Sequence, residues 1–309
     1  MQITSWLRKE DSGLARTTLE LVKATEALGH SVCIRQPQDG MAIWHPSEEV
    51  DVHTIHSQIQ PTAYHDGKPK IMWQHGEPLS SVGNGISMKA IVDLATVVDA
   101  LICMRREEWS TWNSIKRCYL VQKGVDLEKY APMEGITERL SGEPAVLYCE
   151  NWRGMRNPLY LLIAMQEVHK KFPKARFHLY NVQDKKMHET FAALIKHCKF
   201  ETFVRSLQGP VPDITLLMNR VDIVVSALYP LHARTPLEAL ACGKAAICMG
   251  YNEPGYPWTV SEYSPEAFAE TITACWQDYG KLDYRKWAVE KHDVGEMARQ
   301  AVSIYERYL

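Results

Sequence analysis

The sequence lacks any long apolar run, because no window of its 309 residues approaches about 18 consecutive apolar positions. Around Met1 to Leu7 it also lacks the charged, apolar and small-residue regions of a signal peptide. No repeat of solenoid period and no low-complexity tract is present, which excludes repeat architectures. We therefore expect a cytoplasmic protein with no segment that spans or targets a membrane.

Closely spaced cysteines and an excess of one charge are missing as well. The eight cysteines are scattered without a C-x-x-C pair, and several lie in apolar runs, so we expect reduced thiols in the core. The formal net charge of -2 gives no global footprint for nucleic acid or anionic membrane, so any anion site must be local. The chain is long enough for two cores of about 130 to 150 residues each.

The order of elements predicts an α/β fold. The apolar runs are continuous rather than alternating, which is typical of parallel sheets covered on both faces. Strands are predicted at 2–7, 31–35, 50–55, 70–73, 100–104, 145–149, 176–180, 222–226 and 245–249. Helices are predicted at 14–28, 158–172, 187–198 and 236–242, and Ser264–Pro265 and Asp293–Glu296 are typical of helix starts. The polar stretch 134–142 favours two doubly wound domains, 1–135 and 143–290.

Segment 222–250, DIVVSALYPLHARTPLEALACGKAAICMG, carries the most chemical information. It joins a buried strand, a loop, a short helix with an acid inside it, a glycine stop and a second strand. The loop 229–235 delivers backbone N–H groups at the start of the helix, where orphan donors and the helix dipole favour an anion such as a diphosphate. Glu238, in the first turns of this helix, can reach a ligand bound beside it.

This segment resembles the retaining glycosyltransferases of family 4, in which a loop precedes a helix like Leu237–Gly243 and then a strand. The resemblance implies that Glu238 holds the ribose hydroxyls of a nucleotide, since a carboxylate can accept two hydrogen bonds. Leu237 belongs to the same donor-binding motif. The family's second glutamate, eight residues earlier, is Pro230 in this chain. His232, Arg234 and Thr235 are therefore the candidates for recognition of the donor sugar.

Further segments resemble the same family. Segment 147–158, LYCENWRGMRNP, places Arg153 and Arg156 where the family neutralises the donor diphosphate, and fixed guanidinium groups stabilise charge on a leaving phosphate without a metal. In KIMWQHGEP, at 70–78, His75 follows a strand near the sugar. In LVQKGVDLEKYAP, at 120–132, Gly124 is expected to allow the tight turn that closes the first domain.

The turn after the first strand holds Ser12, Gly13 and Arg16, in the place of the family's glycine-containing loop, which faces the diphosphate and the acceptor. With this match the resemblance spans nearly the whole chain. It implies the GT-B architecture, in which two Rossmann-like doubly wound domains face each other across an interdomain cleft. The first domain is then acceptor-side, the second binds the nucleotide sugar, and the terminal helix, 293–309, packs back on the first.

The implied reaction is sugar transfer with retention, by front-face substitution in which the leaving phosphate helps to deprotonate the acceptor. It needs no cofactor and no metal, only a nucleotide-sugar co-substrate whose nucleotide we expect to be UDP or GDP. The acceptor stays open among a sugar, a polysaccharide, a small metabolite and a modified nucleic-acid base. The oligomeric state stays open as well.

Three other functions compete with this one. A glycosyltransferase acting on a DNA base is one, because MRREEWSTW, at 104–112, mixes arginines and aromatics, but its glutamates cancel the charge and a solvated helix with buried tryptophans is favoured. A nucleotide-sugar epimerase needs acid–base groups around the ring, of which the sequence shows no clear set. A non-catalytic nucleotide-sugar binding protein agrees with Pro230.

Overall fold

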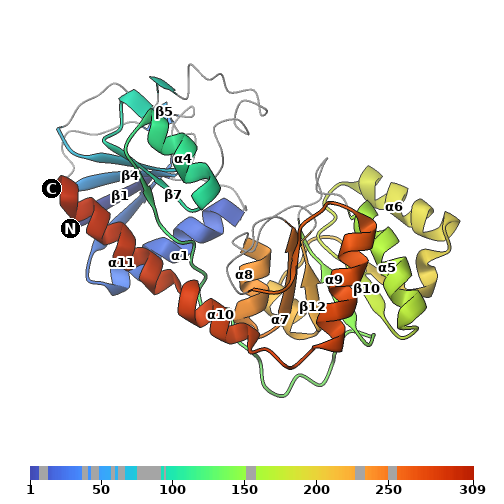
Figure 1. Ribbon diagram of the computed structural model, residues 1–309. Coiled ribbons are helices and arrows are strands. Elements are labelled where there is room, and N and C mark those ends of the chain that lie inside the picture. The colour runs from blue at the N-terminus through green and yellow to red at the C-terminus, as the bar shows by residue number, and fades with distance from the viewer. Residues whose placement is uncertain are drawn as a thin grey trace. The chain divides into compact units, whose positions relative to one another are not determined.

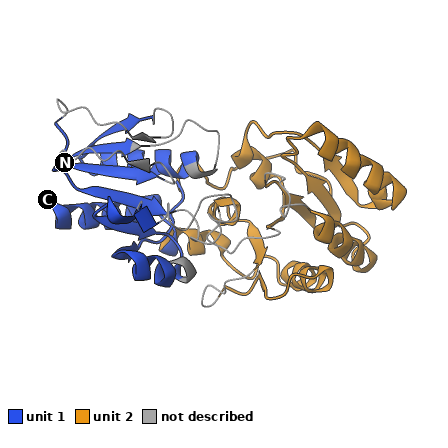
Figure 2. Ribbon diagram, turned by 90° about the horizontal axis from the view of Figure 1, so that it is seen from above, with its two compact units in different colours: residues 1–126, 291–309 blue, residues 127–290 orange. Residues whose placement is uncertain are grey.

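The computed structural model describes residues 1–6, 13–36, 41–42, 49–56, 60–61, 67–74, 92–93, 95–150, 158–226, 234–249 and 256–309. The chain divides into two compact units, coloured separately in Figure 2. The first unit is residues 1–126 with 291–309, and the second is residues 127–290. The chain thus leaves the first unit once and returns to it with its last helix.

The division falls before the polar stretch 134–142 because the second unit binds the backbone of residues 127–133. The guanidinium group of Arg285 donates hydrogen bonds to the carbonyl oxygens of Leu127 and Tyr130, each at 3.1 Å. The Asn219 side chain donates to the carbonyl of Ala131 at 2.9 Å and accepts from the N–H of Met133 at 3.0 Å. These bonds hold the segment against α7 (Ile214–Asn219) and the start of α10 (Tyr284–Lys291), both in the second unit.

In the described part of the first unit, six parallel strands pair in the order β2-β1-β4-β6-β7-β8 (Figure 1). They are β1 (Gln2–Trp6), β2 (Ser31–Arg35), β4 (Val52–His56), β6 (Lys70–Gln74), β7 (Ala100–Cys103) and β8 (Cys118–Leu120). A separate parallel pair is formed by β3 (Met41–Ala42) and β5 (Gln60–Pro61). Strands β4, β6 and β7 are buried along their whole length, as the continuous apolar runs predict.

Helices cover this sheet. They are α1 (Gly13–Ala27), α4 (Arg106–Ile115) and α11 (Val294–Tyr305), the last followed by the 3-10 turn η2 (Glu306–Tyr308). Helices α1 and α11 lie against each other, and Leu21 shares a buried cluster with Met297 and Ala301. The indole N–H of Trp73 donates to the hydroxyl of Tyr305 at 3.0 Å. The terminal helix is therefore part of the first unit's core.

Helix α4 contains the two tryptophans of segment 104–112. Trp112 is buried in a cluster with Ile55 and Leu101. The indole N–H of Trp109 donates to the carbonyl of Cys118 at 2.8 Å. The expected burial of the tryptophans therefore holds for Trp112, whereas Trp109 is anchored by its indole N–H and stays 36% exposed.

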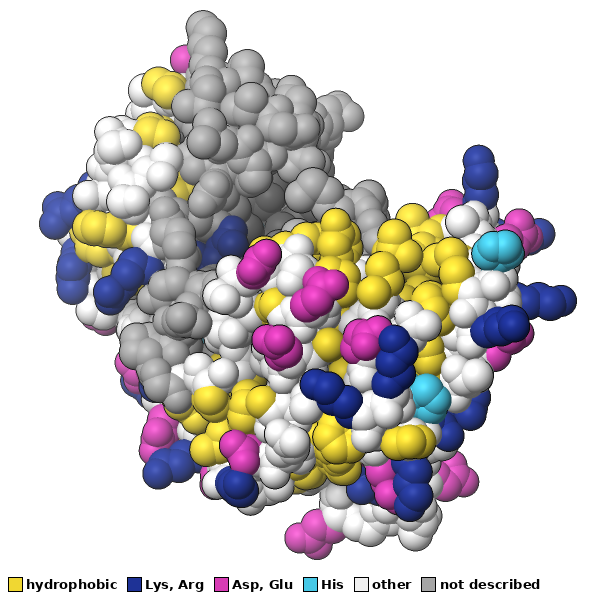
Figure 3. Space-filling model, turned by 45° about the vertical axis from the view of Figure 1, so that its right-hand side comes forward, with side chains coloured by type: hydrophobic (Ala, Val, Ile, Leu, Met, Phe, Trp, Pro, Cys, Tyr) yellow, Lys and Arg dark blue, Asp and Glu magenta, His cyan; other side chains and the backbone are white. Residues whose placement is uncertain are grey.

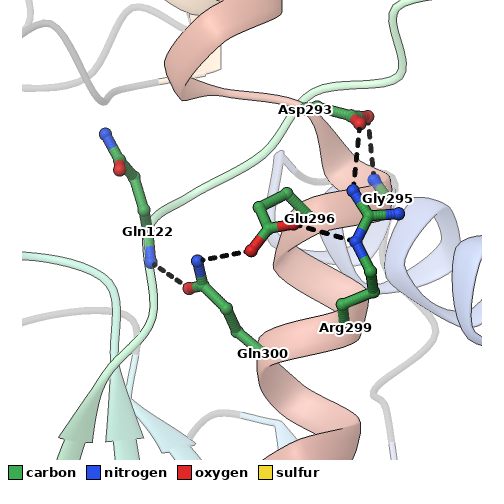
Figure 4. Close-up of polar contacts among 6 residues, drawn as sticks. All are labelled: Gln122, Asp293, Gly295, Glu296, Arg299 and Gln300. Carbon is green, nitrogen blue, oxygen red and sulfur yellow. Dashed lines mark hydrogen bonds and ion pairs between the residues drawn. The ribbon is translucent and has the colours of Figure 1, made fainter.

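The start of α11 is capped by Asp293, whose carboxylate accepts from the N–H of Gly295 at 2.9 Å (Figure 4). The sequence predicts a capping box in which Glu296 reaches back to the cap residue. Instead, the Glu296 carboxylate accepts from Arg299 at 2.8 Å and Gln300 at 3.2 Å, further along the helix. The cap is therefore present and the reciprocal half of the box is absent.

Gly124 has a different role from the one its sequence context predicts. Its φ is not positive, so it does not serve a left-handed turn. The neighbouring Val125 donates to the carbonyl of His292 at 2.8 Å and accepts from the N–H of Val294 at 3.2 Å. A Cβ at Gly124 would lie 2.5 Å from the Cα of Val294. The glycine thus permits two chain segments to approach each other closely.

In the described part of the second unit, six parallel strands pair in the order β11-β10-β9-β12-β13-β14. They are β9 (Ala145–Tyr148), β10 (Arg176–Leu179), β11 (Val204–Leu207), β12 (Ile223–Val225), β13 (Ala245–Met249) and β14 (Thr259–Val260). The helical elements are α5 (Leu159–Lys171), α6 (Lys185–His197), η1 (Phe200–Thr202), α7 (Ile214–Asn219), α8 (Arg234–Ala241), α9 (Pro265–Gln277) and α10 (Tyr284–Lys291). Numbered within the unit, the strand order is 3-2-1-4-5-6, the doubly wound order of dinucleotide-binding folds.

Local sequence explains where these helices begin and end. Ser264 caps α9 by accepting from the N–H of Ala267 at 3.2 Å, and Pro265 occupies the first turn, as predicted. Gly243 follows α8 with a φ of 72°, which a glycine adopts without strain. The predicted α/β fold with two doubly wound units is confirmed.

The structure also tests two expectations drawn from the composition, which concern membrane-spanning segments and the cysteines. No helix in the described ranges is long and apolar enough to cross a membrane. All eight cysteines are free thiols: Cys33 is exposed, Cys198 is half-buried and the other six are buried. Burial raises the pKa of Cys242, Cys248 and Cys275 to about 12, so these three thiols stay protonated and behave as small apolar side chains.

Candidate functional site

The carboxyl ends of β9 and β12 form the switch point of the second sheet. These neighbouring strands are the first and fourth of the unit, and the strands that follow them in the chain, β10 and β13, lie on opposite sides of the pair. Glu150 follows β9 and Ser226 follows β12, and the Ser226 hydroxyl donates to the Glu150 carboxylate at 2.7 Å. Both residues are buried, with 6% and 0% of their surfaces exposed. Ligands of doubly wound folds bind outside such a point.

Helix α8 begins at Arg234 beside the same edge of the sheet, because it connects β12 to β13. Its Glu238 lies in the second turn. The Nε of Arg234 is 2.5 Å from Oε1 of Glu238, and the two side chains are 8% and 2% exposed. The carboxylate that the sequence assigns to the ribose is therefore held in an ion pair on its own helix.

Arg234 is fixed in turn by Tyr130, which is fully buried. A terminal guanidinium nitrogen donates to the Tyr130 hydroxyl at 2.9 Å, and the guanidinium carbon lies 5.5 Å from the centre of the tyrosine ring. Arg285 holds the Tyr130 backbone and also donates to the carbonyl of Ala241 at the end of α8. The helix is thus tied at both ends to the segment that opens the second unit.

A carboxylate can accept up to about four hydrogen bonds, so the ion pair with Arg234 does not by itself exclude contacts between Glu238 and ribose hydroxyls. Its negative charge is also felt nearby, because it adds to burial in raising the pKa of Cys242. Thr235 is half-buried and Leu237 is buried in the same helix. Four of the predicted donor-binding residues, Arg234, Thr235, Leu237 and Glu238, are therefore together on α8.

In the first unit, the predicted Gly13 is the first residue of α1, and Arg16 lies half-buried in the helix's first turn. His56, the last residue of β4, was not among the predicted site residues. Its ring stacks on Trp73 of β6 with centroids 5.6 Å apart and planes 15° apart. Burial lowers the pKa of His56 to about 3, so the imidazole is neutral at physiological pH.

The other predicted site residues lie outside the described residues. They are Ser12, His75, Arg153, Arg156 and His232. In the ranges that the structure does describe, no group of three His, Cys, Asp or Glu side chains is placed to hold a metal ion.

Glu150 and Ser226 were also missed, although a signal for both is present in the sequence. Glu150 comes directly after the predicted strand 145–149, and Ser226 is the last residue of the predicted strand 222–226. Side chains there lie at the carboxyl edge of a parallel sheet, where ligands bind. What the sequence does not show is that these two strands are neighbours.

Residues 143–278, all within the second unit, match the protein family described as Glycosyl transferases group 1. No curated protein sequence matches the chain. Among solved structures, the chain is similar to a glycosyltransferase from Rickettsia africae ESF-5, with 16% identity and a TM-score of 0.73 over 99% of this chain and 98% of that one. Anabaena Alr3699/HepE in complex with UDP shows 14% identity and a TM-score of 0.75 over 99% of each chain.

The same Anabaena protein in complex with UDP-glucose gives 13% identity and a TM-score of 0.74, over 99% of this chain and 100% of that one. At such identities, the likeness establishes the fold, which is that of the GT-B glycosyltransferases. The family match adds that the second unit contains a domain of the group 1 glycosyl transferases. The chain therefore carries a group 1 glycosyl transferase domain over residues 143–278, and the protein is a glycosyltransferase.

Proposed function

We propose that the protein transfers a sugar from a UDP-sugar to an acceptor hydroxyl, with retention at the anomeric carbon and without a metal. The observation that carries the proposal is the group 1 domain at 143–278, in which Glu238 lies on α8, the helix that follows β12. We propose UDP rather than GDP as the nucleotide of the donor, because the similar Anabaena protein is known in complex with UDP and with UDP-glucose.

In this proposal, Glu238 accepts hydrogen bonds from the ribose hydroxyls. Arg234 orients the carboxylate rather than contacting the donor sugar, because its guanidinium group is engaged by Glu238 and Tyr130. Thr235 and His232 are then the candidates for sugar contacts. A binding group that is fixed before the ligand arrives loses less entropy on binding.

Arg153 and Arg156 are proposed to stabilise the negative charge that develops on the leaving phosphate. His75 is proposed to lie near the donor sugar, and Ser12, Gly13 and Arg16 near the diphosphate and the acceptor. The leaving phosphate oxygen takes the proton of the acceptor hydroxyl as the new glycosidic bond forms on the same face. Electrostatic stabilisation of this kind typically contributes about 10²- to 10³-fold per donor group.

The first experiment measures thermal unfolding of the protein with UDP, GDP and ADP, then product formation from a panel of nucleotide sugars. Binding to the folded state raises the midpoint of unfolding. We expect UDP to give the largest rise, and a UDP-sugar to be hydrolysed or transferred with the donor's anomeric configuration in the product. EDTA should leave the rate unchanged. No shift with any nucleotide and no turnover of any nucleotide sugar would refute the proposal.

The second experiment replaces Glu238 by Gln, which keeps its size and removes its charge. Loss of a charge-assisted hydrogen bond should weaken UDP binding by about tenfold or more. Glu290→Gln is the matched control, because Glu290 also ends an i,i+4 pair, with Lys286, but is exposed. Equal UDP affinity in the two variants would remove Glu238 from the site.

The same panel separates the rival functions. An isomerised sugar would indicate an epimerase, and binding without turnover would indicate a non-catalytic binding protein. A nucleic-acid acceptor has less support, because the formal net charge is -2 and Lys and Arg side chains mix with Asp and Glu over the lower and right-hand parts of the face shown in Figure 3. Transfer to oligonucleotides is nevertheless measured in the panel alongside sugars and small metabolites.

A further inference from the structure

Glu150 and Ser226 form a polar contact that none of the assigned roles uses. The Ser226 hydroxyl donates to the Glu150 carboxylate at 2.7 Å, across the two neighbouring strands at the switch point. The backbone on either side is already fixed: Ser226 donates its N–H to the carbonyl of Ile247 at 2.8 Å, and the Asn181 side chain donates to the carbonyl of Cys149 at 3.3 Å. The side-chain pair therefore links the carboxyl ends of β9 and β12 directly.

A buried carboxylate at this place has an energetic cost. Removing a carboxylate from water costs several kcal/mol unless hydrogen bonds replace its hydration. Glu150 is only 6% exposed, and its charge reaches across the sheet edge, because it adds to burial in raising the pKa of Cys248 on β13. Apolar side chains would fill the same volume without that cost. The carboxylate is thus better explained by what it orients than by packing.

Each member of the pair directly precedes a segment with predicted site residues. Glu150 precedes 151–157, which contain Arg153 and Arg156, and Ser226 precedes 227–233, which contain His232. A carboxylate would repel a diphosphate rather than bind it. Glu150 is therefore suited to orient the groups that bind the donor, not to contact its phosphates.

We infer that Glu150 is a positioning residue for the nucleotide-sugar donor, acting through Ser226 to fix the carboxyl ends of β9 and β12 relative to each other. The inference rests on the proposed function. Misplacement of a reacting group by about 1 Å can reduce catalysis by about 10²-fold, so loosening this contact should change kinetics more than stability.

The test measures donor KM, kcat and the unfolding midpoint for Glu150→Ala, Glu150→Gln, Ser226→Ala and the double alanine variant. We expect kcat/KM to fall about tenfold or more in each alanine variant. Glu150→Gln should recover much of this loss, because its amide oxygen can still accept from Ser226. The double variant should be no worse than the more impaired single variant, since both remove the same contact.

Ser206→Ala is the matched control. Ser206 also contacts a buried partner between neighbouring strands of this sheet, His178 at 3.1 Å, but the pair lies on β11 and β10, away from the switch point. The Ser206→Ala variant should leave donor KM and kcat unchanged. Additive losses in the double variant, or losses in Ser206→Ala as large as in Ser226→Ala, would mean that the contact is merely structural.

Two outcomes distinguish a failure of the proposed function from a failure of the inference. If the wild-type protein neither binds nor turns over any nucleotide sugar, the proposed function fails and the inference fails with it. If the wild-type protein turns over a UDP-sugar while Glu150→Ala and Ser226→Ala keep the wild-type KM and kcat, the inference alone is overturned.

Discussion

The Nε of Arg234 lies 2.5 Å from Oε1 of Glu238, one turn further along α8, and both side chains are buried. The same i,i+4 spacing on an exposed helix contributes only about 0.3 to 0.5 kcal/mol. Burial makes the pair contribute more, because water cannot take the place of a lost partner at either side chain. The pair fixes the direction of the carboxylate, so we expect Arg234 to contribute to the stability of the folded protein.

Arg234→Ala should lower the free energy of unfolding by about 3 to 5 kcal/mol, because it leaves Glu238 buried without its counter-ion. The measurement is urea unfolding of the variant and the wild-type protein. Lys286→Ala is the control, since Lys286 pairs with Glu290 at the same spacing at 3.6 Å with both side chains more than half exposed. We expect a loss of no more than about 0.5 kcal/mol there. Similar losses in both variants would contradict the burial argument.

His56 should make the stability of the protein depend on pH. Its pKa is about 3 in the folded protein and 6.5 when unfolded, so only the unfolded state takes up a proton as the pH falls below 6.5. The contribution of the neutral imidazole is fully present above pH 6.5 and is lost toward pH 3. The loss is roughly 1.4 kcal/mol for each pH unit within this window.

This prediction is checked by urea unfolding of wild-type protein and His56→Gln at pH 7, 6 and 5. The difference between the two free energies isolates His56, because His178, whose pKa burial also lowers, titrates in both proteins. The wild-type protein should lose stability relative to the variant as the pH falls. A difference that does not change with pH would contradict the assignment.

The sequence predicted the features that depend on neighbouring residues. Continuous apolar runs located the buried strands, Ser264 and Pro265 located the start of α9, and Gly243 located the end of α8, because these signals act within one or two turns of the chain. The family resemblance placed Glu238 on a short helix, which the structure shows as α8.

Features that depend on distant residues were not predictable in the same way. Glu150 and Ser226 are 76 positions apart, and Arg234 and Tyr130 are 104 apart. A pattern within one segment carries no information on which strands become neighbours. The prediction that Gly124 allows a tight turn was wrong for the same reason, since the atoms that exclude a side chain there belong to Val294 and Asp293.

Asn219 should be the strongest polar contributor to the position of residues 131–133. Its amide donates to the carbonyls of Ala131 and Thr215 at 2.9 and 3.0 Å and accepts from the N–H of Met133 at 3.0 Å. Asn219→Ala should lower the free energy of unfolding by about 2 to 4 kcal/mol, because it leaves backbone groups without partners. Thermal and urea unfolding measure this loss.

Asn113→Ala is the control for that variant. The Asn113 side chain accepts a single backbone hydrogen bond, from Cys118 at 3.1 Å, and Asn113 is exposed, so water can replace it. We expect a loss of about 0.5 to 1 kcal/mol. If Asn219→Ala costs no more than Asn113→Ala, the network around Asn219 does not hold the segment.

Gly124→Ala tests whether close approach, rather than turn geometry, requires this glycine. The new methyl group would lie 2.5 Å from the Cα and 2.7 Å from the N of Val294, and 2.8 Å from the carbonyl oxygen of Asp293. All three atoms are backbone, so no side-chain rotation can relieve the contact, and the free energy of unfolding should fall by about 2 to 3 kcal/mol. Gly209→Ala is the control, because its methyl group would meet only the carbonyl of Val182 at 3.7 Å, an ordinary contact. That variant should stay within about 0.5 kcal/mol of the wild-type protein, and an equal loss in both would show that glycine entropy rather than close approach decides the effect.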